Sequence, residues 1–319
     1  MNYLLDKYLY AFSKLKRANT IYGRAPHKPV LLLSIIELID KGLIVKNAVP
    51  INANLVGVFK ENWQLLVPTL HQADFTQPFY YLQSEKVAGT PIWVLQAYPG
   101  YQINAHIKSV NKLAEVCAYG YFAEELFLLL ADKHSRISFK HLLLDIYFSE
   151  SKASFQAMKQ NGKGYMHDQI IDVLNEPEAQ YKRVSIHTEE DVFVRSGLFK
   201  HLVPKIYNNQ CSFTGMQLTS IFNYSFIDAC HIVPFSHSHN DKINNGIALC
   251  PNLHRAFDRG LVGITNDYRI LVSSLLIEDD SHPYGLGQLE GKNISLPKNE
   301  IHYPEVESLI WHRENVFKG

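Results

Sequence analysis

The sequence lacks most of the features that would place a protein in a specialised class. Its 31 basic and 31 acidic side chains give a formal net charge of zero, so the overall charge alone indicates no polyanionic partner. Four cysteines in 319 residues, at positions 117, 211, 230 and 250, are too few and too scattered for a disulfide framework. We therefore expect reduced thiols and a cytoplasmic location.

Long apolar runs are scarce as well. The N-terminal stretch MNYLLDKYLYAFSKLKRANT mixes acids and bases, which does not fit a signal peptide. The longest apolar run, FAEELFLLLA, carries two glutamates and is too short to span a bilayer. We expect no membrane association. A hydrophobic content of 46% with 19% charged residues is that of an ordinary folded protein.

The length is comfortable for two domains, and the composition suggests where they divide. Residues 1–150 form one block, polar stretches containing glycine and proline indicate a linker with one helix at 151–190, and a second block covers 191–319. In the first block, the apolar run after Pro29 and the stretch NANLVGVFKENWQLL predict helices. The aromatic runs PFYYLQ and PIWVLQ, separated by SEKVAGT, predict a β-hairpin. The fold class is α+β, with an N-terminal helical, winged-helix-like module.

The second block contains two histidines and an asparagine in a suggestive arrangement. His231 ends a strand-like run in DACHIVPFSH, which Pro234 should terminate. Asn245 precedes a glycine, and His254 opens a helical stretch with Asn252 as the expected N-cap and Gly260 as the stop. Strand, loop, strand and helix make a ββα element that brings both histidines to one cleft.

These residue types suit hydrolysis of a phosphodiester. A neutral imidazole can take a proton from water near neutral pH. A divalent cation can neutralise the charge that develops on the phosphate and the leaving oxygen. His254 and Asp258 are four residues apart and therefore share one helix face, where they could hold such an ion. The asparagine could orient the histidine-bearing loop or ligate through its side-chain oxygen.

The text CSFTG…FIDACHIVPFSH…NNGIALCPNLHRAFDRGLVGI resembles the HNH endonuclease family, in its McrA-like branch, over about residues 199–264. The resemblance implies a ββα-metal fold, with His231 as general base, Asn245 as the motif asparagine and His254 as a metal ligand. It also implies a Mg²⁺ or Mn²⁺ ion and a ligating carboxylate near the first histidine. Many members have that acid directly before the histidine, where this sequence has Cys230, so either Asp228 or Asp258 must supply it. No structural zinc is expected, because paired CxxC motifs are missing.

Blander interpretations of these residues stay open. Asp258 could pair with Arg255 or cap a loop instead of binding metal. His237 and His239, in a polar loop, are expected to be solvated. Cys230 and Cys250 are expected to be small core residues.

The first block offers candidates for binding DNA. Arg24, His27 and Lys28 approach the N-terminus of a buried helix, whose partial positive charge suits phosphate. The alternative is a capped helix beside an aromatic core hairpin. The text RAPHKPVLLL…TQPFYYLQ…GTPIWVLQ resembles the sulfur-binding domain of phosphorothioate-dependent restriction endonucleases. This resemblance implies that a pocket for a phosphate sulfur is bordered by the following residues: His27, Lys28, Gln77, Pro78 and Tyr81.

The combined interpretation is a modification-dependent restriction endonuclease, acting in defence against foreign DNA, with phosphorothioated double-stranded DNA as its partner. One alternative is an HNH endonuclease directed to methylated or unmodified DNA, in which Tyr80 and Trp93 would stack a flipped base. Another alternative is a non-catalytic DNA-binding regulator. One active site per chain leaves both a homodimer and sequential nicking open.

Overall fold

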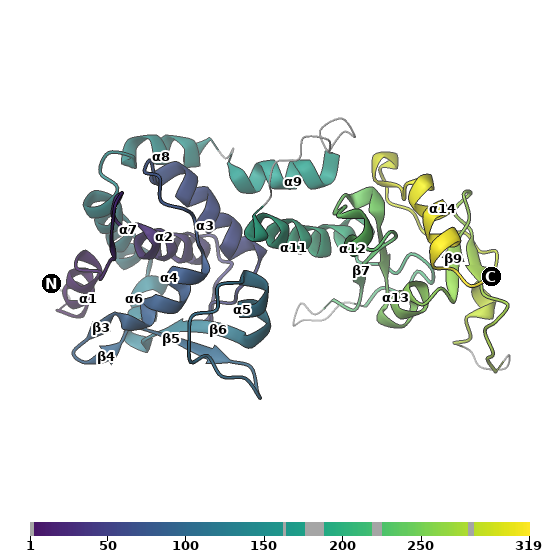
Figure 1. The fold of residues 1–319 in the computed structure, drawn as a ribbon, viewed down its shortest axis with the longest axis horizontal. Coiled ribbons are helices and arrows are strands. Elements are labelled where there is room, and N and C mark those ends of the chain that lie inside the picture. The colour runs from purple at the N-terminus through teal and green to yellow at the C-terminus, as the bar shows by residue number, and fades with distance from the viewer. Residues whose placement is uncertain (1–2, 162–163, 176–187, 219–224, 280–283) are drawn as a thin grey trace. The chain divides into compact units, whose positions relative to one another are not determined.

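The computed structural model describes residues 3–161, 164–175, 188–218, 225–279 and 284–319. Contacts divide the chain into two compact units: the first covers Met1–Gln169 and Ser185–Val194, and the second covers Ile170–Val184 and Arg195–Gly319. Each unit combines helices with two-stranded antiparallel sheets (Figure 1), which confirms the predicted α+β class. Part of the expected linker, at 176–187, lies outside the described residues.

The first unit is mainly helical. Its helices are α1 (Tyr3–Ser13), α2 (His27–Asp40), α3 (Ala53–Leu66), α4 (Thr76–Tyr81), α5 (Val110–Val116), α6 (Glu124–Ala131), α7 (Lys133–Tyr147) and α8 (Lys152–Gln160). Its strands are β1 (Asn19–Thr20), β2 (Gly23–Arg24), β3 (Lys86–Val87), β4 (Thr90–Pro91), β5 (Trp93–Ala97) and β6 (Cys117–Phe122). The unit boundary falls inside α9 (Tyr165–Asn175) and α11 (Glu189–Ile206).

Helix α2 forms the centre of the first unit. It is apolar around its whole circumference and buried along most of its length, the pattern of a helix enclosed on all sides. It contacts α3, α4, α6 and α7. The helix begins at His27, earlier than expected, because Pro29 falls within its first turn, where a missing backbone N–H costs nothing.

The predicted hairpin is wrong in its first strand. The run PFYYLQ lies in α4 and in the 3₁₀ turn Leu82–Ser84, while β5 pairs with β6 instead. Phe75 and Phe79, four residues apart, form ring contacts with Phe59 and Trp93. Burying one helical face of aromatic rings therefore outweighs their intrinsic preference for strands. On β6, only a glycine fits at position 120, because a Cβ there would overlap the Trp93 ring.

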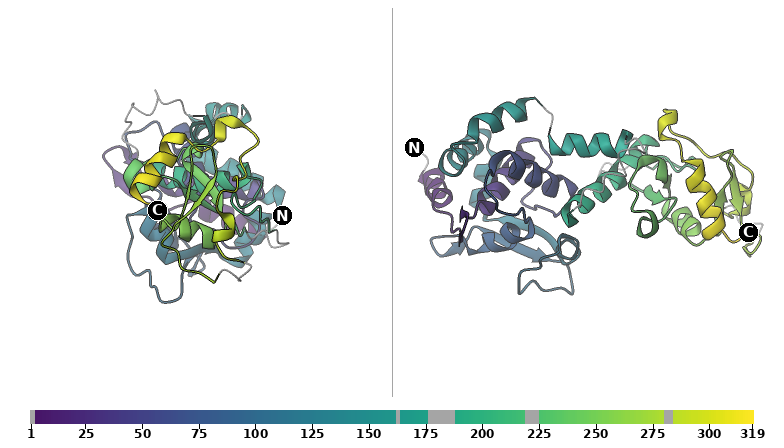
Figure 2. Two further views of the ribbon diagram at one scale, coloured as in Figure 1. Left: turned by 90° about the vertical axis from the view of Figure 1, so that its right-hand side faces the viewer. Right: turned by 45° about the horizontal axis from the view of Figure 1, so that its top comes forward.

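The second unit contains the predicted ββα element. Its strands are β7 (Asp228–His231), β8 (Gly246–Leu249), β9 (Val262–Ile264) and β10 (Ile270–Val272). Its helices are α12 (Phe235–Ser238), α13 (Pro251–Asp258) and α14 (Val306–Asn315), with 3₁₀ turns at Ile243–Asn245, Gly287–Leu289 and Glu300–His302. Figure 2 shows the yellow helix α14 at the end of the chain, which packs against β9.

Strand β7 runs antiparallel to β8, with His231 opposite Gly246. Helix α13 follows β8 directly, and Cys250 is its N-cap rather than the expected Asn252, because Pro251 already occupies the first helical position. The helix ends before Gly260, as expected, where a positive φ of 72° favours glycine. Among the described residues, no helix is long and apolar enough to cross a membrane.

Candidate active site

The imidazole of His231 is held on two sides. Its ring stacks on Phe199 of α11, with centroids 3.9 Å apart and planes inclined by 6°. Gly246 allows this approach, since a Cβ at that position would lie 2.9 Å from the Phe199 ring. The Nε2 atom lies 2.9 Å from Oδ1 of Asp241, whose side chain is only 3% exposed.

The pairing with Asp241 fixes which ring nitrogen carries a proton. A carboxylate only accepts hydrogen bonds, so Nε2 of His231 donates to Asp241 and Nδ1 keeps its lone pair. A histidine with a free lone pair and an oriented ring is equipped to take a proton from water. The buried acid was missed from the sequence, because nothing in the polar run HSHNDKI distinguishes Asp241 from a solvated aspartate.

Asn245 fastens the loop that follows His231. Its fully buried amide accepts a hydrogen bond from the Val233 backbone N–H at 2.9 Å and donates to the carbonyls of Val233 and Asn240 at 3.0 and 3.1 Å. The backbone N–H of Ile232 also donates to the Asn245 carbonyl at 2.9 Å. With these bonds formed, the side-chain oxygen is engaged by the backbone, and the geometry favours a loop-organising amide over a metal ligand.

Helix α13 presents His254 and Asp258 on one face. Nε2 of His254 lies 3.4 Å from Oδ2 of Asp258, and Nδ1 lies 3.3 Å from Oδ2 of Asp228 on β7. The two ring nitrogens point in different directions, so the two aspartates lie on different sides of the ring. Asp258 therefore lies on the Nε2 side of the His254 ring. Asp228 approaches Nδ1 and orients the ring.

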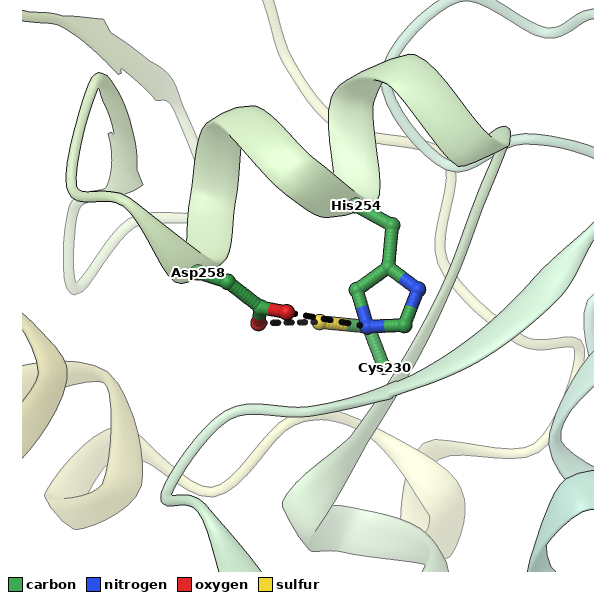
Figure 3. Close-up of side chains that lie close together, drawn as sticks. All are labelled: Cys230, His254 and Asp258. Carbon is green, nitrogen blue, oxygen red and sulfur yellow. Dashed lines mark hydrogen bonds and ion pairs between the residues drawn. The ribbon is translucent and has the colours of Figure 1, made fainter.

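Cys230 completes the group on the Nε2 side (Figure 3). Its Sγ lies 3.7 Å from Oδ1 of Asp258, and the ligand atoms of Cys230, His254 and Asp258 all lie within 4.8 Å of one another. Burial, reinforced by Asp258 and Asp228, raises the pKa of the Cys230 thiol well above its usual value. Thiolate, imidazole and carboxylate are all ligands of divalent metal ions, so the donor set fits one. Cys230 is fully buried, as expected for a small core residue, but its sulfur also faces His254 and Asp258.

Both histidines line a single cavity of about 320 Å³, together with Asp258. Both rings therefore border the same cleft, as expected for a ββα element. His312 of α14, also at this cavity, stacks on Phe257 and makes a hydrogen bond through Nε2 to the Phe257 carbonyl at 3.1 Å. Its burial lowers the pKa to about 4, so His312 stays neutral while it fastens α13.

The remaining second-unit candidates have other partners. His237 faces the ring of Trp311, with centroids 5.5 Å apart, and His239 meets the ring of Phe235 at 5.4 Å. Cys250 and Cys211 form a hydrogen-bonded thiol pair, which lowers the pKa of Cys211 to about 5 and raises that of Cys250.

A second cavity, of about 400 Å³, lies in the first unit. It contains five of the six residues expected to bind DNA, and its lining combines cationic with apolar side chains: Lys16, Arg17, Ala18, Ala25, His27, Lys28, Gln77, Pro78, Tyr81 and Ser84. We call it the α2–α4 cavity, since its central residues come from these helices. Arg24 does not line it but borders a neighbouring cavity to which Arg17 also contributes.

The cations of the α2–α4 cavity are partly neutralised. Lys28 is buried and forms an ion pair with Glu85, and it donates to Oγ of Ser84 at 2.9 Å. The guanidinium of Arg17 lies 4.6 Å from the ring centroid of Tyr147. His27 is half-buried with Nε2 3.0 Å from the Gln72 carbonyl, and burial lowers its pKa. Glu85, 57 residues beyond Lys28, gave no sequence signal of this pairing.

Comparison with known proteins agrees with the geometry of the second unit. Residues 211–265 match the family model of the HNH endonucleases. The C-terminal part of this chain contains an HNH endonuclease domain. Over 88 residues the chain is 29% identical to the type IV methyl-directed restriction enzyme EcoKMcrA of Escherichia coli (strain K12). The match covers 27% of this chain and 32% of the relative, so the chain spans about a third of that protein's length.

Among solved structures, the modification dependent TagI restriction endonuclease is similar over 39% of each chain, with 22% sequence identity and a TM-score of 0.31.

Proposed function

We propose that this chain is a modification-dependent restriction endonuclease that hydrolyses the DNA backbone at the second-unit cavity. The observation that carries the proposal is the meeting of His231, His254 and Asp258 at one cavity within a matched HNH domain. The activity of the whole chain is our inference, because the match extends over only part of it.

In this proposal His231 is the general base. With Nε2 donating to Asp241, Nδ1 takes the proton of a water molecule, and Asp241 stabilises the imidazolium that forms. Phe199 and the loop fastened by Asn245 keep the ring from turning away. Asn245 thus acts on catalysis through the position of the base.

His254 and Asp258 are proposed to hold the divalent ion, and Asp228 to orient His254. Such an ion neutralises the charge that develops on the phosphate and the leaving oxygen. The expectation from sequence was Mg²⁺ or Mn²⁺.

We further propose that the α2–α4 cavity receives the sulfur of a phosphorothioate. Sulfur is larger and less hydrated than oxygen, so an apolar wall beside cations suits it. Ala18, Ala25 and Pro78 supply that wall, and Lys16 and Arg17 supply the charge. Proline has no backbone donor, so an ordinary phosphate oxygen would lose hydration there without compensation. Contacts from lysine and arginine to neighbouring phosphates make the affinity dependent on salt.

The name of the Escherichia coli relative supports a second candidate, in which the first unit selects methylated DNA. A panel of one duplex sequence, carrying phosphorothioate, 5-methylcytosine or no modification, separates these possibilities. We expect cleavage of the phosphorothioated duplex alone. Cleavage of the methylated duplex alone would support the second candidate, and equal cleavage of all three would remove modification dependence.

Three further proposals concern the protein as a whole. Its free cysteines fit a reducing, cytoplasmic environment. We propose residues 1–150 as the DNA-recognition domain and 191–319 as the nuclease domain. Since the described residues of each chain contain one proposed nuclease site, cleavage of both strands requires a homodimer or two successive nicks. Sedimentation of the chain with and without the cleaved duplex distinguishes the two.

A further inference from the structure

The cysteine at the second-unit site is buried, yet its sulfur faces two metal-binding side chains instead of apolar neighbours alone. We propose that Cys230 is itself a thiolate ligand, and that it makes the site select thiophilic divalent ions, such as Co²⁺ and Zn²⁺, over Mg²⁺. The inference rests on the proposed function, since it concerns the ion of the same site.

The spacing of the three donors fits one ion. Ligand atoms about 2.0–2.3 Å from a tetrahedral ion lie roughly 3.3–3.8 Å from one another. Two of the separations, 3.4 Å between His254 Nε2 and Asp258 Oδ2 and 3.7 Å between Cys230 Sγ and Asp258 Oδ1, fall in that range. The Cys230 sulfur and the His254 ring nitrogen also lie within 4.8 Å of each other, so rotation of the side chains can bring the three donors onto one ion.

The exposure of the donors gives the ion an entry side. Asp258 is 56% exposed and His254 27% exposed in their side chains, while Cys230 is fully buried. An ion arriving through the cavity meets His254 and Asp258 first, and the sulfur closes the inner side of the site. The thiol proton leaves to solvent as the sulfur–metal bond forms.

The chemistry of the donors determines the preference among ions. Mg²⁺ requires six hard oxygen ligands in a near-octahedral arrangement, and a thiolate is a poor substitute for one of them. Co²⁺ and Zn²⁺, which lie late in the first row of transition metals, bind thiolate and imidazole more tightly than Mg²⁺ does. The sulfur of Cys230 therefore disfavours Mg²⁺. An aspartate at position 230 would favour Mg²⁺ instead.

The test uses the full chain without DNA, titrated with Co²⁺ and followed by absorbance. We expect a near-ultraviolet thiolate-to-cobalt charge-transfer band that a large excess of Mg²⁺ does not remove. Cys230→Ser should abolish the band and weaken Co²⁺ binding by about 100-fold. Cys117→Ser and Cys250→Ser are the matched controls, and both should keep it. The second control excludes binding by the Cys211–Cys250 pair.

Cys230→Asp supplies an independent arm, because it restores an oxygen ligand. We expect this variant to lose the charge-transfer band and to gain at least about tenfold in cleavage supported by Mg²⁺ relative to the wild type. Circular dichroism verifies that both Cys230 variants fold.

A band that persists in Cys230→Ser, or a wild-type protein that binds Co²⁺ without a band, would overturn the role of the thiolate. These results on the metal ligand can be distinguished from a failure of the proposed nuclease function. A wild type that shows the band but cleaves no DNA keeps the ligand assignment and loses the nuclease, and cleavage without the band does the reverse.

Discussion

The two cavities treat charge in opposite ways. The lining of the α2–α4 cavity includes the cations Lys16, Arg17 and Lys28, of which Lys28 pairs with Glu85, and apolar side chains complete the wall. At the second-unit cavity, the carboxylate of Asp258 approaches His254 and the thiol of Cys230. None of the described residues that line this cavity is a lysine or an arginine. The lining of the α2–α4 cavity is therefore rich in basic side chains, whereas the described lining of the second-unit cavity contains a carboxylate and no lysine or arginine.

This contrast teaches how one ligand, a DNA backbone, can be both bound and cut. In our proposal, phosphate binds at the α2–α4 cavity through the cations Lys16, Arg17 and Lys28, which belong to the chain itself. In the same proposal, the attraction for phosphate at the second-unit cavity comes from a bound metal ion, so we expect cleavage, but not binding, to depend on that ion.

The largest effect is expected at the nuclease cavity. His231→Ala should lower the cleavage rate by about 10³-fold or more, since it removes the general base. DNA affinity, measured by fluorescence anisotropy, should stay unchanged because the cations of the first cavity are intact. His237→Ala, a nearby histidine that contacts Trp311, is the control and should cleave normally. Wild-type cleavage by His231→Ala would defeat the base assignment.

A smaller loss of cleavage rate is expected when Asp241, the hydrogen-bond partner of His231, is changed. Asp241→Asn keeps the shape but removes the charge that stabilises the imidazolium, and should reduce kcat by about 100-fold while leaving KM unchanged. Asp241→Glu, which keeps the charge, should recover part of the rate. If both variants lose affinity together with rate, Asp241 has a structural role only.

The carboxylate of Asp191 should contribute more to the stability of the fold than that of Asp258. Burial opposes ionisation of Asp191, but hydrogen bonds from Lys60, Tyr165 and Thr188 lower its pKa to about 2, below its usual 3.8. A depressed carboxyl pKa stabilises the fold above pH 4, and this contribution is lost as the pH falls toward 2. Asp191→Asn should therefore reduce the free energy of unfolding by about 2 kcal/mol at pH 7.

Urea denaturation of both proteins between pH 7 and 2 measures the difference, which should disappear in the acid range. Asp258→Asn serves as the comparison, because its exposed carboxylate gains no such set of donors in the fold. This variant should lose cleavage without losing stability. A constant difference for Asp191→Asn down to pH 2 would contradict the electrostatic origin.

The smallest effect is expected for sulfur discrimination. Pro78→Ser introduces a hydroxyl donor into the apolar wall, so an ordinary phosphate oxygen can be accepted. Contact of sulfur with the wall is worth only about 1 kcal/mol, from roughly 40 Å² of buried surface. The ratio of Kd values for unmodified and phosphorothioated duplexes should fall less than tenfold. A ratio unchanged in Pro78→Ser would exclude Pro78 from discrimination.

The sequence predicted the ββα element better than the contacts that surround it. The ββα element is local, since His231, Asn245 and His254 lie within 24 residues of one another, and the strand, loop and helix signals each occur in one short stretch. By contrast, Asp241 reaches its role only through burial, and Cys230 through the carboxylate that α13 brings to it. Such contacts depend on packing, which periodicity does not encode.

In the first unit, the sequence predicted which residues lie together better than it predicted the secondary structure that carries them. His27, Lys28, Gln77, Pro78 and Tyr81 line one cavity, although Pro78 and Tyr81 lie on a helix where a strand was expected. The spacing of Phe75 and Phe79 carried the helical signal, but the aromatic content concealed it. The pairing of Lys28 with Glu85 could not be predicted, because it joins elements far apart in the chain.

The central claim is that the second-unit cavity cuts DNA with the help of a divalent ion, whereas the first binds DNA without one. The most direct measurement follows a labelled phosphorothioated duplex with the metal-free full chain, before and after addition of divalent ions, recording binding and cleavage together. The account predicts binding in both conditions and cleavage only after the ion is added. Cleavage at an equal rate in the presence of a chelator, or none with any divalent ion, would contradict it.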